Sequence, residues 1–200
     1  MKPWYVEVFG ATIELGDYIT LIAAPDKRVR LSVWPETPGR GRIRFGNYCL
    51  ICPGVRIGAA SEITIGDNTM LASSVYVTDS DWHGIYDRIA IGQAEPVTIG
   101  ENVWIGDSTI VCKGVTIGDN SIIGAGAVVV KDIPANVVAA GNPARIVKDL
   151  DPTETLTKRS HWFSDPSRLA RDFDLLDRAT LRGNTMGRWL RTLIAPTRND

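Results

Sequence analysis

One segment of the chain gathers the side chains that could carry acid–base chemistry. It runs from Thr78 to Pro96 and contains His83, one of only 2 histidines in the 200 residues. Imidazole changes its charge near neutral pH, so histidine is well suited to act as a general base toward a hydroxyl group. His83 is therefore our candidate catalytic base. We call the substrate that carries this hydroxyl group the acceptor. The candidate residues for binding it, in the same segment, are Asp79, Asp81, Trp82, Tyr86 and Asp87.

These neighbours favour a polyhydroxylated acceptor. Carboxylates hydrogen-bond to sugar hydroxyls, and an aromatic face covers the C–H side of a sugar ring. An amine would suit the same side chains nearly as well. A third interpretation is that the polar side chains are simply exposed on a surface loop and contact nothing.

The residues on both sides of this segment repeat every six positions. After the segment, the aliphatic residue that leads each unit falls at Ile99, Ile105, Val111, Ile117, Ile123 and Val129. Before it, the same spacing is led by Phe45, Ile51 and Ile57, and then by Ile65, Leu71 and Val77. A helix would repeat every 3.6 residues and an exposed strand every two, so neither explains the period.

A period of six predicts short strands separated by tight turns and stacked into a solenoid. Its interior is then filled by ladders of aliphatic side chains. The segment between Val77 and Val97 lacks the period, so it must leave the solenoid as a loop, a common place for function in repeat proteins. We expect an all-β parallel solenoid over residues 1–148, a protruding loop over 78–96, and a helical extension over 149–200.

The composition agrees with a single compact globular domain. Hydrophobic residues make up 44% of the chain and charged residues 22%. A net charge of −1 argues against nucleic acid as the main partner, because that would require a dominant basic surface. No apolar run reaches membrane-spanning length, and the first residues lack the apolar stretch of a signal peptide. We therefore expect a cytoplasmic protein.

The three cysteines predict neither disulfides nor a metal site. Cys49 and Cys52 form a C-x-x-C pair, but Cys49 falls on an inward ladder position that suits a small apolar side chain. The chain has no second such pair, and neither histidine is close in sequence. Cys112 lies at a turn, and we interpret it in the same structural way.

The segment after residue 148 differs in character. Asp151 and Asp165 are each followed by proline and are plausible helix starts. Five arginines lie among apolar residues from Arg178 onward, which is typical either of a helix packed on its own protein or of one that rests weakly on a membrane surface or a polyanion. We favour packing. His161 lies in this part and has no expected role in catalysis.

Several of these stretches resemble a known family. Val97–Gly106 (VTIGENVWIG), Gly114–Asn120 and the closing run Asp132–Arg145 are very similar to the hexapeptide-repeat acyltransferases, in particular to galactoside, maltose and nodulation-factor O-acetyltransferases. The resemblance is dense over 45–148, thin over 1–44 and absent beyond 150. The closing run is its most specific part, since simple repetition would not produce it.

The resemblance implies a left-handed parallel β-helix that assembles as a homotrimer, with acetyl-CoA bound between neighbouring subunits. It also places a catalytic histidine in the protruding loop, at an interval before the V-W-I-G motif that His83 matches. Because acetyl-CoA is already an activated thioester, the acceptor oxygen would attack it directly, without an acyl-enzyme. No metal is required.

The family pattern further assigns cofactor contacts by position. Trp104 would flank the pantetheine arm, and the backbone of Ala125 would meet the pantetheine amides. Lys131, Arg145 and Lys148 match the basic positions near the CoA phosphates. Asp107 departs from the pattern, because relatives often have a hydroxyl residue there, so a backbone N–H or Ser108 would have to stabilise the oxyanion.

The sequence therefore predicts an acetyl-CoA-dependent O-acetyltransferase acting on a sugar or glycan precursor. Two alternatives stay open: transfer to an amino sugar or other small amine, and a catalytically silent repeat scaffold that binds a partner. A zinc carbonic anhydrase on the same solenoid is excluded, because it needs three histidine ligands and the chain has 2 histidines.

Overall fold

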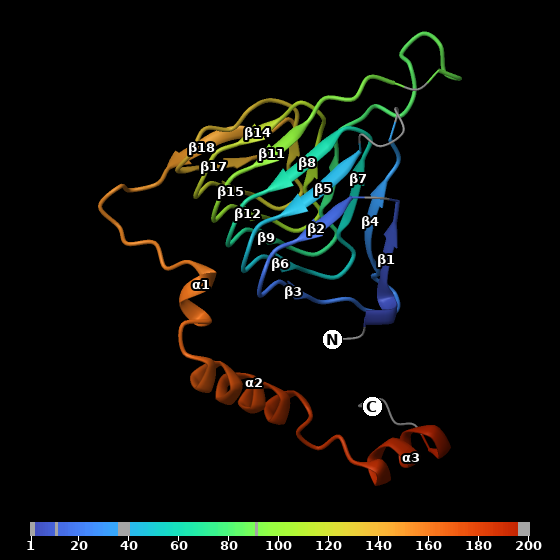
Figure 1. The fold of residues 1–200 in the computed structure, drawn as a ribbon. Helices are drawn as coiled ribbons and strands as arrows, with labels where there is room; N and C mark the ends of the chain where they lie inside the picture. The colour runs from blue at the N-terminus through green and yellow to red at the C-terminus, as the bar shows by residue number, and fades with distance from the viewer. Residues whose placement is uncertain (1–2, 11, 36–40, 91, 196–200) are drawn as a thin grey trace. The chain divides into compact units, whose positions relative to one another are not determined.

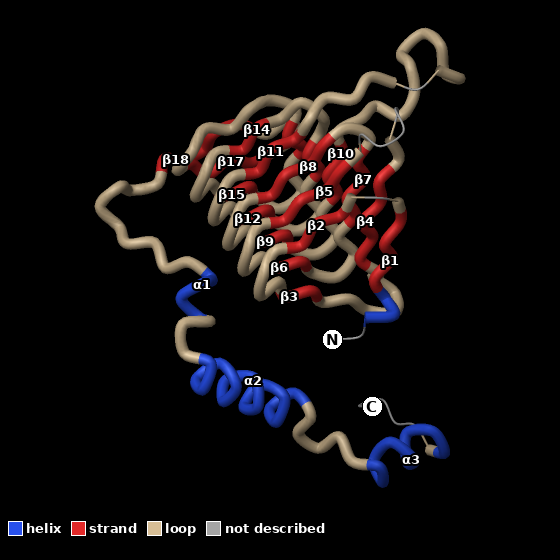
Figure 2. Tube along the Cα trace, in the orientation of Figure 1, coloured by secondary structure: helices blue, strands red, loops and turns tan. Residues whose placement is uncertain are grey.

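The structure is a computed structural model that describes residues 3–10, 12–35, 41–90 and 92–195 (Figures 1 and 2). The chain divides into two compact units, Met1–Ser160 and His161–Asp200. The first unit is built from three β-sheets, and the second is helical (Figure 2).

Successive strands of the chain belong to sheets A, B and C in turn. A short 3₁₀ helix, η1 (Pro3–Tyr5), precedes the first strand. Sheet A contains β1 (Val6–Phe9), β4 (Val29–Val33), β7 (Arg56–Ala59), β10 (Tyr76–Thr78), β13 (Ile110–Val111) and β16 (Val128–Val129). Sheet B contains β2 (Ile13–Leu15), β5 (Arg42–Phe45), β8 (Glu62–Ile65), β11 (Val97–Ile99) and β14 (Thr116–Ile117). Sheet C contains β3 (Thr20–Leu21), β6 (Leu50–Ile51), β9 (Met70–Leu71), β12 (Trp104–Ile105), β15 (Ile122–Ile123), β17 (Val137–Ala140) and β18 (Arg145–Asp149).

Each turn of the chain adds one strand to each sheet, and the strands within a sheet run parallel. In sheet C, for example, Ile105 lies in register with Leu71 on one side and Ile123 on the other. All three side chains are buried, as are the leading aliphatic residues of the other repeats. The period of six therefore predicted the parallel strands and the aliphatic ladders correctly. The last pair, β17 with β18, is antiparallel.

The turns between the sheets stack into three corners, which we call AB, BC and CA after the sheets they join in chain order. At corner BC, Asn102, Asn120 and Asn136 have positive φ, which asparagine tolerates better than most residues. Their side chains hydrogen-bond from turn to turn, Asn102 to Asn120 at 3.0 Å and Asn120 to Asn136 at 2.9 Å. Over these three turns corner BC thus carries a polar ladder.

The first unit extends beyond residue 148, where the sequence analysis placed its end. Residues 150–160 run back along corner BC: Lys158 pairs with Glu101 at 2.8 Å, and Asn68 Oδ1 accepts from the Ser160 amide at 2.7 Å. Arg159 Nε donates to the Tyr48 carbonyl at 2.8 Å, and partial burial lowers the pKa of its guanidinium. These contacts tie the segment to three successive turns of the solenoid.

The C-terminal part of the chain is helical, with α1 (Arg159–Trp162), α2 (Pro166–Thr180) and α3 (Met186–Ile194). Asp165 caps α2, its carboxylate accepting from the Arg168 amide, which confirms that predicted helix start. The predicted start at Asp151 was wrong: its side chain closes a local turn on Thr153 instead. Within the described residues, no helix is both long and apolar enough to cross a membrane.

Candidate functional site

The predicted loop leaves the first unit at corner AB, between the end of β10 and the start of β11 (Figure 1, green). Its two arms pair at the base. Ser80 and Ala94 form an antiparallel bridge, and the Glu95 amide donates to the Asp79 carbonyl at 2.8 Å. The loop is therefore fixed to the solenoid at its root.

Asp79 is part of that root and not of an exposed surface. Its side chain is fully buried, and its two carboxylate oxygens accept from the amides of Ala60 and Ser61 at 2.7 and 2.8 Å. Burial raises the pKa of the carboxyl group, while the amide hydrogen bonds oppose that rise. This placement gives Asp79 a structural role and does not support its predicted contact with an acceptor.

The other loop carboxylates also have local partners. Asp81 pairs with Lys113 at 3.0 Å, and Lys113 pairs in turn with Glu95 at 2.9 Å, so one cation links both arms of the loop. Asp87 Oδ1 accepts from the amide of Ile89 at 3.0 Å. Tyr86, by contrast, is almost completely exposed. Both carboxylates remain on the surface, where an acceptor could reach them.

Trp82 leans back onto sheet A. Its indole Nε1 donates to Thr78 Oγ1 at 3.0 Å, and its backbone φ of 61° lies in the left-handed region that non-glycine residues rarely occupy. The ring passes over Gly58 of β7, where an added Cβ would lie 3.2 Å from Trp82 Cζ2. A glycine at this point of the sheet thus leaves space for the indole.

His83 follows Trp82 and is exposed. Its backbone is closely packed even though its ring is not: a Cβ on Gly92 would lie 2.6 Å from the His83 carbonyl oxygen. The next residue, Gly84, donates its amide to Ala90 at 3.0 Å across the loop. The imidazole itself has no hydrogen-bond or ionic partner among the described residues, so both ring nitrogens are available.

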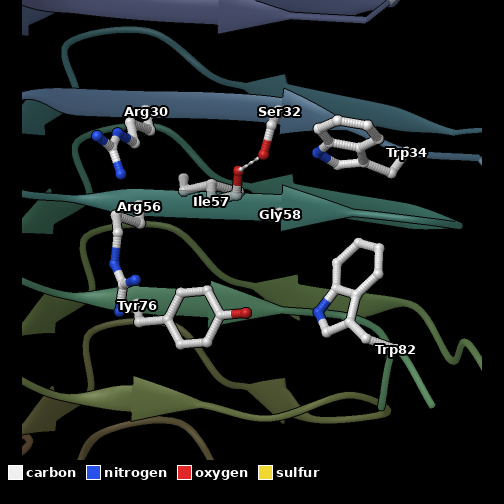
Figure 3. Close-up of a pocket in the computed structure, with 8 residues that line it drawn as sticks. All are labelled: Arg30, Ser32, Trp34, Arg56, Ile57, Gly58, Tyr76 and Trp82. Atoms are coloured by element: carbon white, nitrogen blue, oxygen red, sulfur yellow. Dashed lines mark hydrogen bonds between the residues drawn. The ribbon is translucent and has the colours of Figure 1, made fainter. Parts of the chain in front are cut away.

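A groove of about 360 Å³ crosses the outer face of sheet A beside Trp82 (Figure 3). Arg30 and Arg56 lie at one end, and Trp34 and Trp82 at the other (Figure 3). The hydroxyl group of Tyr76 points along the groove toward Trp82 (Figure 3). The groove therefore has aromatic faces at the end formed by Trp82, the residue before the candidate base, and cations at the other end. Its walls are lined by Arg30, Ser32, Trp34, Arg56, Ile57, Gly58, Tyr76 and Trp82.

The predicted pantetheine contacts lie on another part of the surface. Trp104 is half-exposed on β12 of sheet C, and Ala125 is exposed at corner CA. The backbone N–H of Ala125 has no hydrogen-bond partner among the described residues, so it could donate to a ligand amide. Because His83 belongs to corner AB, one copy of the chain does not bring these residues and the candidate base to the same corner.

The three predicted phosphate-binding cations are all exposed and are spread over the last turn. Lys131 follows β16 at corner AB, whereas Arg145 and Lys148 lie on β18, opposite Ala140 and Val138 of β17. Arg145 donates to the Ala144 carbonyl at 2.7 Å. Neither lysine forms an ion pair with a described residue.

The contact between Asp107 and Ser108 bears on which group could stabilise the oxyanion. Ser108 Oγ donates a hydrogen bond to Asp107 Oδ1 at 2.6 Å, so the hydroxyl hydrogen is already engaged. The backbone N–H of Asp107, on the other hand, has no partner among the described residues. Of the two donors considered from the sequence, the geometry favours the backbone N–H.

The cysteines have the structural surroundings that were predicted. Cys49 is buried in the core, and burial raises the pKa of its thiol to about 11. Burial also raises the pKa of Cys52 and of Cys112. No group of three or more histidine, cysteine or carboxylate side chains in the described part of the chain is arranged to hold a metal ion.

Comparison with known proteins agrees with the repeat architecture. The family described as "Bacterial transferase hexapeptide (six repeats)" matches residues 96–131. The polysialic acid O-acetyltransferase of Escherichia coli O1:K1 is 41% identical over 113 residues, which cover 52% of this chain and 37% of that protein. The galactoside O-acetyltransferase of Escherichia coli K12 is 44% identical over 105 residues, covering 52% and 50%.

A solved structure extends the match. Galactoside acetyltransferase in complex with coenzyme A is 30% identical, with a TM-score of 0.50, and the alignment covers 72% of this chain and 71% of that one. The chain belongs to the hexapeptide-repeat acyltransferase family. It spans less than two thirds of the length of the curated relatives described above.

Apart from Trp82, the groove residues of this hexapeptide-repeat protein were missed from the sequence, although a signal was present. Arg30, Arg56 and Tyr76 each stand one position before a buried aliphatic residue, and they lie in register on adjacent strands. In a parallel solenoid that position faces outward at the same height on every turn. Aligning the repeats by register, and not only by their aliphatic leaders, would have placed these residues side by side.

Proposed function

We propose that the protein is an acetyl-CoA-dependent O-acetyltransferase that acts on a hydroxyl group of a sugar or glycan precursor. The observation that carries the proposal is the position of His83, which is exposed, has both ring nitrogens available, and follows directly on a tryptophan that lines the groove on sheet A. Relatives named for O-acetyl transfer to polysialic acid and galactosides support the reaction class.

The chemistry requires few groups. An imidazole nitrogen of His83 takes the proton from the acceptor hydroxyl while that oxygen attacks the thioester carbonyl. The carbon–sulfur bond then breaks, the leaving thiolate receives the proton, and an acetyl ester and CoA are released. The Asp107 N–H is our candidate for stabilising the oxyanion. Donors of this kind contribute roughly 10²- to 10³-fold to the rate.

The proposal includes a homotrimer of left-handed parallel β-helices. Trp104 and the free N–H of Ala125 would hold pantetheine, and Lys131, Arg145 and Lys148 would meet the CoA phosphates. Because Trp104 on sheet C and Ala125 at corner CA lie away from His83 at corner AB, a complete site requires a neighbouring copy whose corner CA faces the protruding loop. Acetyl-CoA is a metabolite of the cell interior, so we place the reaction in the cytoplasm.

The test is release of free CoA thiol from acetyl-CoA in the presence of a panel of sugars and matched amines. Thiol release that depends on a sugar, with the ester found by mass spectrometry, supports the proposal. Release with amines alone would favour N-acetyl transfer. If no acceptor raises the rate above the rate in buffer, the protein is not the proposed acetyltransferase, and the scaffold hypothesis gains support.

A further inference from the structure

The groove on sheet A continues into a second, cationic part. A hollow of about 400 Å³ adjoins it and shares Arg30 and Arg56 as walls. The two hollows together make one surface whose aromatic end lies beside the protruding loop and whose other end approaches corner CA. The second hollow is lined by Pro25, Asp26, Lys27, Arg28, Arg30, Gly54, Arg56 and Ser74.

The second hollow contains more basic than acidic side chains. Glu7 pairs with both Arg28 and Arg30, at 2.7 and 2.6 Å, so a single carboxylate serves two guanidinium groups. Among the residues that line the hollow, one is acidic, Asp26, and four are basic: Lys27, Arg28, Arg30 and Arg56. Arg56 has no carboxylate within salt-bridge distance among the described residues. This end of the groove therefore carries an excess of positive charge that a ligand could neutralise.

Arg56 is also held in place. Its guanidinium lies over the ring of Tyr76, 4.7 Å from the ring centre, in a cation–π contact. A guanidinium group in such a contact keeps its N–H donors, which can bind a carboxylate or phosphate in a bidentate manner. An arginine fixed in this way loses little additional freedom when it binds an anion.

The aromatic end is equally ordered. Trp34 is stacked on Phe9 with ring centres 4.2 Å apart, and Trp82 is held by its hydrogen bond to Thr78. Both indoles line the groove (Figure 3). Flat rings that are already immobilised suit the C–H face of a sugar.

We propose that the groove selects an anionic saccharide as the acceptor: a sugar ring lies against Trp34 and Trp82, and its carboxylate or phosphate group is bound by Arg56 with Arg30. This inference rests on the proposed function for its direction, because Trp82, which lines the groove, directly precedes the candidate base His83. It goes further by assigning the acceptor a negative charge and by naming the arginine that recognises it.

The test compares a neutral hexose, the corresponding hexuronic acid and the hexose 1-phosphate, both as acetyl acceptors and as ligands in calorimetric titrations without acetyl-CoA. We expect tighter binding and higher kcat/KM for one or both anionic sugars. Arg56→Gln should reduce both by roughly ten- to a hundredfold while leaving the neutral sugar unchanged. Arg56→Lys should recover part of the loss, and added salt should weaken the anionic ligands selectively.

Arg44→Gln is the matched control, because Arg44 is an exposed arginine of sheet B that is paired with Glu14. It should change neither quantity. Preference for the carboxylate over the phosphate, or the reverse, identifies which anion the site accepts. Equal affinity of the wild type for neutral and anionic sugars, or equal loss for all three in Arg56→Gln, would overturn the inference.

The two proposals can fail separately. Binding of an anionic sugar that depends on Arg56, without any acetyl transfer, would uphold the groove assignment and contradict the enzymatic proposal. Acetyl transfer that is equally efficient with neutral and anionic sugars, and that does not depend on Arg56 for any of them, would do the opposite.

Discussion

The indole nitrogen of Trp82 donates a 3.0 Å hydrogen bond to the hydroxyl of Thr78, the last residue of β10. This bond connects the residue before His83 directly to the C-terminal end of an internal strand of sheet A. The candidate base thus stands on a loop whose root is ordered, although its own ring is exposed. Such an arrangement can hold a base in position while leaving space for a substrate.

Replacing His83 tests the catalytic assignment. His83→Ala should lower kcat by about 10²- to 10⁴-fold, because a positioned general base contributes that much. The dissociation constant for CoA, measured by calorimetry, should stay the same. His161→Ala, which removes the other histidine from the second compact unit, should be fully active. Wild-type turnover in His83→Ala would remove this residue from the mechanism.

Replacing Asp79 tests its structural role. Asp79→Ala leaves the amides of Ala60 and Ser61 without an acceptor, and a buried donor left unpaired costs about 1–3 kcal/mol. For a chain of this size we expect the melting temperature to fall by roughly 2–4 °C for each kcal/mol. Scanning calorimetry measures the shift.

The control for Asp79 is Asp81→Ala, two residues further along the loop, where only an exposed ion pair is lost. It should shift the melting temperature less. An Asp79→Ala variant with wild-type stability and a raised KM for the acceptor would show that Asp79 contacts substrate after all.

Lys113 provides a test that depends on pH. Its hydrogen bonds to Glu95 and Asp81 raise its pKa above the ordinary value of 10.5, so the folded state favours the charged form. The stabilisation is therefore fully present below pH 10.5 and is lost as the pH rises through the raised value. Because the carboxylate partners are exposed, we expect roughly 1 kcal/mol or less in total.

The measurement is the difference in thermal stability between wild type and Lys113→Met from pH 7 to pH 11. The difference should be constant up to about pH 10 and then decrease as Lys113 loses its proton. Lys131→Met, which removes an exposed lysine without an ion pair among the described residues, should show no difference at any pH.

The sequence predicted the interior of the protein better than its surface. The burial of Ile105 could be predicted because it leads a six-residue unit, as do Leu71 and Ile123, its neighbours on the adjacent turns. The role of Asp79 could not be predicted, because its hydrogen-bond partners are backbone amides 18 and 19 residues away. Every residue except proline has such an amide, so the side chains at those positions give no signal. Arg56 was missed for a related reason. Its place in the groove depends on Arg30 and Tyr76, which lie in register with it on the adjacent strands but are distant in sequence.

The oxyanion donor is the remaining part of the proposed mechanism that substitution can decide. Since the Ser108 hydroxyl donates its hydrogen bond to Asp107, we expect removal of the hydroxyl to change kcat less than about threefold, whereas loss of a true oxyanion donor costs roughly 10²- to 10³-fold. Ser108→Gly is the preferred variant, because the φ of 58° at this position suits glycine and the fold should tolerate the change.

Ser108→Ala is its matched companion, since it removes the same hydroxyl but keeps a Cβ in the left-handed region. If both variants keep near wild-type kcat, the backbone N–H of Asp107 stays the candidate donor. A loss of a hundredfold or more in both, with unchanged melting temperature and CoA affinity, would instead assign the oxyanion to the Ser108 hydroxyl. That result would require the hydroxyl to turn away from Asp107 when substrate binds.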